Sequence, residues 1–323
     1  MKSGGIGRAH SRASTWALAL CIALLTVSGW ALATDTAVRR VGYDYYQVGN
    51  LKAVRPAAIE PALLLVGGGH WPRDAFTWWV ARSGHGHVVI LRASGADNLQ
   101  RELYAEIGGV ASVQTLVFHD RAAASDPQVL DILQHADAIF IAGGDQANYV
   151  RFWKGTPVNL ALDRHVEEGK PIGGTSAGLA ILGGYAYGAL DGDSITSARA
   201  LHDPLGSGVT LVEGFLHLPG MQEVITDTHF AARGRLGRLI AFVANLRHAG
   251  RAEVVGLGVD QDSALGIDGH GVGRLFTLDH GFAWLVRPPA APVRIEPGRP
   301  LDYLGVRVTG IGPHSRFDLR HLT

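Results

Sequence analysis

Short apolar runs recur along the first two thirds of the chain, and each one ends in a turn rich in Gly or polar residues. Runs of this kind, rich in Val, Ile and Leu, are typical of strands buried on both faces of a sheet. We predict such strands at 62–66, 87–92, 113–118 and 138–142, and another in the approach to Gly173. Segments with helical character lie between them, at 76–80, after Asp126-Pro127 and at 157–168. Alternating strands and helices at this spacing predict a parallel sheet with right-handed crossovers.

The last third of the chain has a different pattern. Two more buried strands are expected at 224–226 and 254–259, with an arginine-rich helix between them. The tail then carries short apolar segments between Gly and Pro turns, at 272–276, 282–286, 293–295 and 306–308. Such segments are typical of antiparallel strands, and we place them on the edge of the same domain. The predicted fold class is therefore α/β: a mostly parallel sheet flanked by helices, with extra antiparallel C-terminal strands, in a single domain from 34 to 323.

The N-terminal residues have the pattern of an export signal. Basic residues precede an apolar run from Trp16 to Val27, and Ala31-Leu32-Ala33 follows it. A charged segment, a short apolar segment and an Ala-x-Ala site define a cleavable signal peptide. We expect residues 1–33 to be removed and the mature chain to be periplasmic or extracellular, without membrane attachment. An uncleaved anchor is the alternative, although the apolar run is short for a spanning helix.

Composition narrows the chemistry. Lys+Arg and Asp+Glu both number 29, so the overall charge gives no reason to expect nucleic acid as a partner. The single cysteine, Cys21, lies in the leader, so the mature chain has no disulfide, thiol nucleophile or cysteine metal ligand. Gly67-Gly68-Gly69 lacks the spacing of a dinucleotide-binding turn, and none of the Gly-rich turns is a Walker A loop. We expect neither a cofactor nor a metal.

The residues from Gly174 to Gly178 fit G-x-S-x-G, the pattern of a nucleophile elbow. In such an elbow a sharp turn between strand and helix presents a serine hydroxyl, here that of Ser176, at the edge of the sheet. The alternative is a Gly-rich turn in which Ser176 only caps a helix. Turns at Gly67, Gly143 and Gly174 each follow a strand, and such turns can converge at the carboxyl edge of a parallel sheet, where active sites lie.

Serine hydrolysis also needs a base and donors for the oxyanion. For the base we choose His229, which follows the strand at 224–226 and precedes the arginine-rich helix. The alternative for this residue is a surface or capping histidine. The oxyanion donors would be the amide of Ala177 and an amide of the Gly143-Gly144 turn, for which we choose Gly144.

Four segments together resemble cyanophycinase and its exported relatives, in the serine peptidase family that includes aspartyl dipeptidase (peptidase E). They occur in the family's order and cover roughly residues 60–290. The segments are Gly143-Gly144-Asp145-Gln146, Gly173 to Gly178, Asp227-Thr228-His229-Phe230 with the arginine-rich stretch after it, and Gly258 to Leu265. The resemblance implies a flavodoxin-like fold related to the class I glutamine amidotransferases, with Ser176 as nucleophile and His229 as base.

The resemblance also implies a substrate. Cyanophycin is a poly-aspartate chain with arginine joined to each aspartate side chain, and the family releases β-aspartyl-arginine dipeptides from it. Gln146, Asp227, Arg235 and Arg238 match family positions that would recognise the carboxylates and the guanidinium of this unit. Otherwise the arginines would line a solvated helix face and Asp227 would serve as a cap. The expected partner is cyanophycin or an aspartyl-arginyl peptide, and the sequence leaves the oligomeric state open, a homodimer included.

Two departures from the family pattern bear on activity. Thr228 stands where the family usually has Gln, next to His229. More important, the family's Gly-x-Asp-Glu segment supplies a glutamate as third catalytic member, and this chain has Gln261 there. An amide oxygen accepts the His229 N–H but has no charge to stabilise an imidazolium. Asp262 or Asp260 is the alternative third member.

These residues are compatible with three functions. The first is an exported cyanophycinase-like serine exopeptidase. The second, which Gln261 favours, is a catalytically weak relative that binds aspartyl or arginyl peptides. The third is a peptidase for another isoaspartyl or α-aspartyl dipeptide. Release of aspartyl-arginine from cyanophycin would favour the first over the second.

Overall fold

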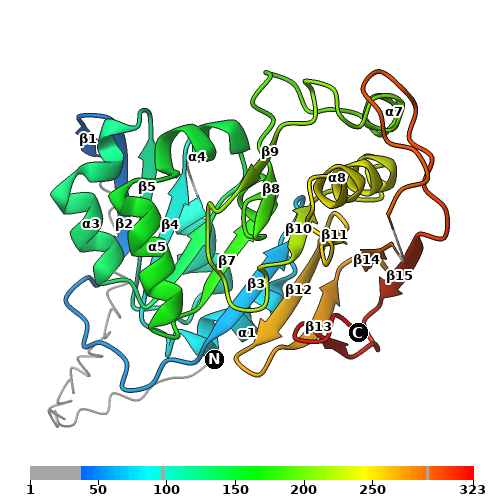
Figure 1. Cartoon of the computed structure of the whole chain (residues 1–323). Coiled ribbons are helices and arrows are strands. Elements are labelled where there is room, and N and C mark those ends of the chain that lie inside the picture. The colour runs from blue at the N-terminus through cyan, green and yellow to red at the C-terminus, as the bar shows by residue number, and fades with distance from the viewer. Residues whose placement is uncertain (1–37, 96–98, 289–290) are drawn as a thin grey trace, which may run out of the picture. The chain divides into compact units, whose positions relative to one another are not determined.

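The predicted parallel sheet forms the centre of the computed structural model, which describes residues 38–95, 99–288 and 291–323 (Figure 1). Its parallel strands lie in the order β5 (Ser112–Phe118), β4 (His87–Arg92), β6 (Ala138–Ile141), β7 (Ile172–Thr175) and β3 (Ala62–Val66). These bounds follow the predicted ones closely. The reason is that almost every residue of the strands is buried, so the apolar run ends where the strand ends.

Antiparallel strands extend this sheet at both edges to a total of ten. Beyond β5 lie β2 (Tyr43–Gly49) and β1 (Val38–Arg40). Beyond β3 lie β12 (Ser263–Asp268), β13 (Val272–Thr277) and β16 (Phe317–Asp318). β12 pairs with β3 along its whole length, with Ala264 opposite Val66, and so brings the segment that precedes β12 beside the end of β3.

The remaining strands form a second sheet of six, which the sequence pattern did not foresee. Its order is β15 (Arg307–Ile311), β14 (Ala283–Arg287), β11 (Val255–Val259), β10 (Val224–Asp227), β8 (Tyr185–Tyr187) and β9 (Leu211–Glu213). β8, β10 and β11 run parallel, and the other neighbours are antiparallel. β10 and β11 cannot join the central sheet next to β3, because β12 already pairs with that edge. The predicted α/β class, with a mostly parallel centre and antiparallel C-terminal strands, is confirmed.

Helices pack against both sheets (Figure 1). They are α1 (Arg73–Arg82), α2 (Leu99–Arg101), the π-helix η1 (Glu102–Ile107), the 3₁₀ helix η2 (Ala122–Ser125), α3 (Pro127–Gln134), α4 (Gln146–Trp153), α5 (Pro157–Glu167), α6 (Ala177–Ala180), α7 (Ser197–His202) and α8 (Leu236–His248). Asp126 caps α3 by accepting the amides of Gln128 and Val129 at 2.8 and 3.2 Å. Asp-Pro at a helix start therefore behaves here as its sequence pattern predicts.

The core follows the alternation of side chains along the strands. Leu64 packs on one face of the central sheet with Phe76 of α1, whereas its neighbour Leu65 packs on the opposite face. A third apolar cluster joins the second sheet to α8, through Ile225 and Phe242 among others. The carboxyl ends of β3, β7, β10 and β11 are thus held in place by buried apolar contacts on several sides.

The described residues between 38 and 323 form one compact unit. The predicted signal peptide, 1–33, lies outside the described residues. In the part of the chain that the structure describes, none of the helices has the length and apolarity that crossing a membrane requires.

Candidate active site

Ser176 lies at the sharp turn between β7 and α6, at the carboxyl edge of the central sheet. Its backbone angles are φ 52° and ψ −120°, a conformation that residues other than glycine rarely adopt. The flanking glycines permit close packing of this turn: a Cβ at Gly174 would lie 2.7 Å from the carbonyl carbon of Gly178, and one at Gly178 would lie 2.0 Å from the Ile141 oxygen. The turn therefore has the strained geometry that G-x-S-x-G predicts.

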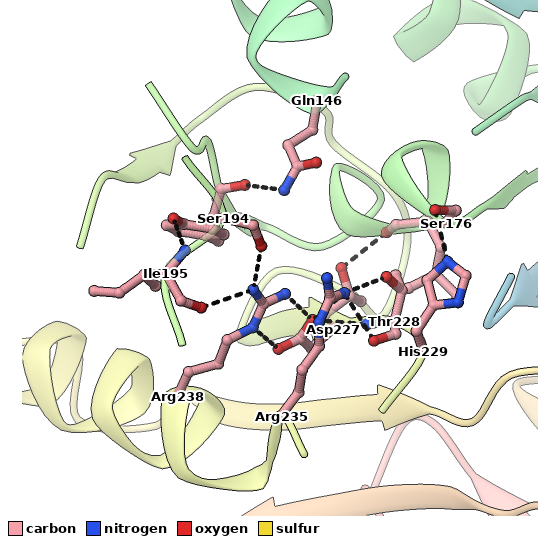
Figure 2. A network of polar contacts seen from close by, with 12 residues as sticks. Gln146, Ser176, Ser194, Ile195, Asp227, Thr228, His229, Arg235 and Arg238 are labelled. Carbon is pink, nitrogen blue, oxygen red and sulfur yellow. Dashed lines mark hydrogen bonds and ion pairs between the residues drawn. The ribbon is translucent and has the colours of Figure 1, made fainter. Parts of the chain in front are cut away.

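The hydroxyl of Ser176 faces His229, which follows β10 (Figure 2). The distance from Ser176 Oγ to His229 Nε2 is 3.0 Å, and His229 Nδ1 lies 2.9 Å from Gln261 Oε1. Because an amide oxygen only accepts, Nδ1 carries the ring proton and Nε2 offers its lone pair to the serine hydroxyl. Ser176, His229 and Gln261 thus form one hydrogen-bonded line.

The surroundings of His229 favour its neutral form. Burial lowers the pKa of the imidazole, and the nearby cations Arg233 and Arg235 lower it further, against the opposing effects of the Gln261 hydrogen bond and of Asp227. A neutral imidazole is the form that accepts a serine proton. This environment therefore suits a general base.

The two carboxylates beside Gln261 point elsewhere. Asp260 is 7 % exposed, and its oxygens accept N–H groups of Ala231, Phe282 and Trp284 at 2.9, 2.9 and 3.0 Å. Asp262 Oδ1 accepts the backbone amide of His70 at 2.5 Å. Among the described residues, the side chain that hydrogen-bonds to His229 Nδ1 is that of Gln261. Gln261 and Asp262 lie in the turn between β11 and β12, where Asp262 has φ 57°, so the side chains of Gln261 and the two aspartates point in different directions.

The Gly143-Gly144 turn lies across from the nucleophile. A Cβ at Gly143 would be 3.3 Å from Ser176 Cβ, so a side chain there would crowd the hydroxyl. The Tyr149 hydroxyl, 2.7 Å from the Ala142 oxygen, helps to fix the turn. Ala177 is the first residue of α6, so its amide has no acceptor within the helix. Gly143 and Ala177 thus lie beside Ser176, and the oxyanion roles of the Gly144 and Ala177 amides stay a prediction.

A buried charge cluster is formed by Asp227, which precedes His229 in the sequence, and by Arg235 and Arg238, which follow it. Arg238 donates from Nε and Nη2 to both carboxylate oxygens of Asp227 at 2.8 and 2.6 Å, and from Nη1 to Ser194 Oγ at 2.8 Å. Asp227 and Arg238 are each 2 % exposed. Their polar atoms are turned toward each other (Figure 2), and the direct contact with substrate that the sequence suggests for them stays a prediction.

Arg235 is held differently from Arg238. Its Nη1 donates to the carbonyl and hydroxyl oxygens of Thr228 at 2.9 and 2.8 Å and lies 3.4 Å from Asp227 Oδ1. Burial lowers the pKa of Arg235 to about 10, against the attraction of Asp227, so the guanidinium is charged at neutral pH. Two arginines share one carboxylate, and the cluster therefore keeps one positive charge.

Gln146 approaches this region from the opposite side. It is the first residue of α4, and its Nε2 lies 3.5 Å from the carbonyl oxygen of Tyr187. Figure 2 shows its side chain extending from α4 toward the side of the site where Arg235 and Arg238 lie, with the amide nitrogen turned away from Ser176. The described residues contain no group of three or more His, Cys, Asp or Glu side chains arranged to hold a metal ion.

Comparison with known proteins places this site in a family. The model of Peptidase family S51 matches residues 100–215, which include the elbow and the Gly143-Gly144 turn. The cyanophycinase of Synechococcus elongatus is 31% identical over 240 residues, which cover 72% of this chain and 69% of that protein. The chain belongs to peptidase family S51. The cyanophycinase of Trichormus variabilis is 27% identical over 300 residues, which cover 88% of this chain and 94% of that protein.

Membership of family S51 makes this chain a serine-type peptidase of the cyanophycinase-like kind, and the resemblance inferred from the four segments is confirmed. The fold agrees with a solved structure, that of a peptidase from an acI-B1 Actinobacterium. It matches with a TM-score of 0.51 at 15% identity over 81% of this chain and 98% of that chain.

Sequence reasoning missed residues that hold the S51 site together. Ser194 contacts Arg238 from a loop that carries no motif, so nothing in the sequence marks it. Gly68 packs against the base: a Cβ there would lie 2.2 Å from His229 Cε1. The run Gly67-Gly68-Gly69 is the available signal, because glycine is typical of positions where another group approaches the backbone closely.

Proposed function

We propose that the mature chain is an exported serine exopeptidase that releases β-aspartyl-arginine from cyanophycin through an acyl-enzyme. The observation that carries this proposal is the hydrogen-bonded line from Ser176 through His229 to Gln261, at the carboxyl edge of the sheet. The identity to cyanophycinases supports the choice of substrate.

In the first step Ser176 Oγ would attack the main-chain carbonyl of an aspartyl unit while its proton passes to His229 Nε2. The amides of Gly144 and Ala177 would donate to the oxygen on which negative charge develops. His229 would then give its proton to the leaving amine, and the C–N bond breaks. Water, deprotonated by the same ring, would hydrolyse the ester and restore Ser176.

The charges around the site suit an acidic substrate. The cluster of Asp227, Arg235 and Arg238 retains one positive charge, and Arg235 is the less saturated of its two cations. A carboxylate of the aspartyl-arginine unit would complete this balance. Asp227 is poorly placed to bind the substrate guanidinium, because Arg238 already occupies both of its carboxylate oxygens.

That occupied carboxylate favours a second candidate, a peptidase for another isoaspartyl or α-aspartyl dipeptide. Such a substrate needs a cation for its carboxylate and needs no acid for a guanidinium. The neutral Gln261 favours the remaining candidate, a relative that binds aspartyl peptides and turns them over slowly.

Product analysis separates the candidates. Purified mature protein is incubated with insoluble cyanophycin and, separately, with β-aspartyl and α-aspartyl dipeptides that lack arginine, and soluble products are identified by mass spectrometry. Soluble β-aspartyl-arginine from the wild type, absent with Ser176→Ala, is the result we expect. Cleavage of the other dipeptides alone would select the peptidase for another aspartyl dipeptide. Saturable binding without products would select the relative that binds aspartyl peptides and turns them over slowly.

A further inference from the structure

Three amides of the active site donate to three consecutive carbonyl groups at the end of β3. The pairs, donor first, are Ser176 and Val66 at 3.1 Å, His229 and Gly67 at 2.6 Å, and Asp262 and Gly68 at 2.8 Å. The donors come from three separate connections, which follow β7, β10 and β11. Each donor is the nucleophile, the base or the residue directly after the base's partner, Gln261.

The same three donors have strained backbones. Ser176, His229 and Asp262 have φ values of 52°, 43° and 57°, and they are three of the seven non-glycine residues with positive φ in the described part of the chain. Such conformations persist only where the surroundings over-determine them, and they concentrate at functional sites. The hydrogen bonds to β3 are a direct source of that constraint.

Asp262 is hydrogen-bonded on both sides of the Gly68-Gly69 turn that follows β3. Its carboxylate accepts the amide of His70 at 2.5 Å, while its own amide binds Gly68, so Asp262 clasps both ends of the Gly68-Gly69 turn. There is no room for side chains in between: a Cβ at Gly68 would lie 2.2 Å from His229 Cε1, and one at Gly69 would lie 2.2 Å from Asp262 Oδ1. The turn is therefore pressed against the base on one side and against Asp262 on the other.

We propose that the segment from Val66 to Gly68 is the alignment template of the catalytic line, and that Asp262 is the positioning residue that holds the template in place. This inference rests on the roles proposed for Ser176, His229 and Gln261. Ser176 and His229 are 53 residues apart in the sequence, and His229 and Gln261 are 32 apart, so no local structure sets their distances. The segment from Val66 to Gly68 is a common backbone reference that sets the positions of all three residues. A misplacement of about 1 Å in such a site costs about 100-fold in rate.

Two substitutions of Asp262 separate its possible roles. Asp262→Asn keeps an oxygen that accepts the His70 amide and tolerates the left-handed backbone, but it removes the charge. Asp262→Gly keeps the backbone conformation and removes the clasp. We expect kcat of Asp262→Asn to stay within about 3-fold of wild type, and kcat of Asp262→Gly to fall about 10- to 100-fold with little change in KM. His85→Gly is the matched control. His85 also has a positive φ (61°) and one side-chain hydrogen bond to a backbone oxygen, but it precedes β4 and so lies at the amino-terminal ends of the strands, away from the site.

A second readout does not depend on turnover. The pKa of His229 is lowered mainly by burial and also by Arg233 and Arg235, against Gln261 and Asp227. Release of the turn would expose the ring, so its pKa in Asp262→Gly should rise toward the ordinary value, while Asp262→Asn leaves it low. NMR titration of the histidine rings, with His229→Ala to assign the signal, measures this shift even in a protein that cleaves no tested substrate.

The template itself is tested by a pair of glycines with the same backbone angle. Gly68 has φ +100° and faces the His229 ring, whereas Gly192 has φ +102° and nothing within 4 Å of the position of a Cβ. Both alanine variants place a side chain at nearly the same positive φ, but only the Cβ of Gly68→Ala would meet the His229 ring. We expect Gly68→Ala to lose about 100-fold or more in kcat and Gly192→Ala to retain it.

Each outcome decides the matter. Full activity and an unchanged His229 titration in Asp262→Gly would overturn the template. A loss in Asp262→Asn as large as in Asp262→Gly would make the charge of Asp262 essential and assign it to the chemistry instead. Absence of turnover by the wild type on every aspartyl substrate would count against the proposed function, while the NMR titration would still test the template.

Discussion

Gln261 presents an amide oxygen to His229, at 2.9 Å, in a position where a carboxylate would add a negative charge. The amide oxygen fixes the tautomer of the ring only partly, because the same side chain also carries an NH2 group that can donate to the other tautomer. It does little for the imidazolium that forms when His229 takes the serine proton. At the scale of the residue, the geometry of a serine peptidase is therefore combined with weaker stabilisation of the charged intermediate.

Gln261→Glu should raise kcat by about 10- to 100-fold. In serine proteases the opposite exchange, acid to amide, lowers turnover about 10⁴-fold. Gln261 is exposed, so solvent will reduce the gain. KM should change less, because the added interaction strengthens in the transition state. Gln134→Glu, at an exposed position of α3, is the control for an added charge. No gain with Gln261→Glu would mean that another group already stabilises the imidazolium.

The pH dependence of the wild type follows from the same ring. Burial and two arginines lower the pKa of His229, so the neutral base persists below the ordinary titration range of histidine, near pH 6.5. The acid limb of kcat/KM should therefore lie below this value. Gln261→Glu should move it upward, because a carboxylate favours the protonated ring. A pH profile on one aspartyl substrate measures the acid limbs of the wild type and of Gln261→Glu. An acid limb above pH 6.5 in the wild type would contradict a lowered pKa of His229.

At the scale of the elements, Asp227 and Arg238 join the end of β10 to α8. The pair is almost fully buried and doubly hydrogen-bonded, and the Arg238 guanidinium also lies 5.2 Å from the centre of the Tyr187 ring. Removal of one member of such a pair leaves the other charge buried without a partner. The geometry consequently gives Arg238 a role in stability beside any role in recognition.

Arg238→Leu should lower the free energy of unfolding by about 3–5 kcal/mol. Arg251→Leu breaks the exposed ion pair with Glu213 and should change the free energy of unfolding little. Urea unfolding of both variants beside the wild type measures the difference. If Arg238→Leu keeps its stability and instead raises KM for an aspartyl substrate, Arg238 acts mainly in substrate binding, as its family position suggests.

At the scale of the whole molecule, the predicted signal peptide would determine where the peptidase acts. We propose that residues 1–33 direct export and are removed, which leaves a mature chain that begins near Thr34. Mass spectrometry of the N-terminus after expression in a bacterium should find this cleavage in the exported fraction. Ala33→Arg, which spoils the small-residue site, should retain the leader. An intact N-terminus on soluble cytoplasmic protein would contradict the proposal.

The sequence by itself determined the features that depend on local interactions. The central strands, the caps and the elbow at Ser176 were predictable because apolar runs, Asp-Pro and G-x-S-x-G act over a few neighbouring residues. Order along the chain made His229 a candidate, because it follows a strand and parallel strands present their ends at one edge, and the resemblance to the family then favoured it as the base.

Only the tertiary structure decided what depends on distant segments. The division into two sheets follows from the pairing of β12 with β3, which lie far apart in the sequence. The choice of Gln261 over Asp260 and Asp262 depends on which way each side chain turns once β11, β14 and the His70 amide are in place. The burial of Arg238, which a helical pattern suggests could face solvent, depends on Asp227 and Ser194 closing around it. Long-range contacts of this kind leave no periodic signal, because each donor and acceptor is an ordinary polar residue until folding brings its partner within reach.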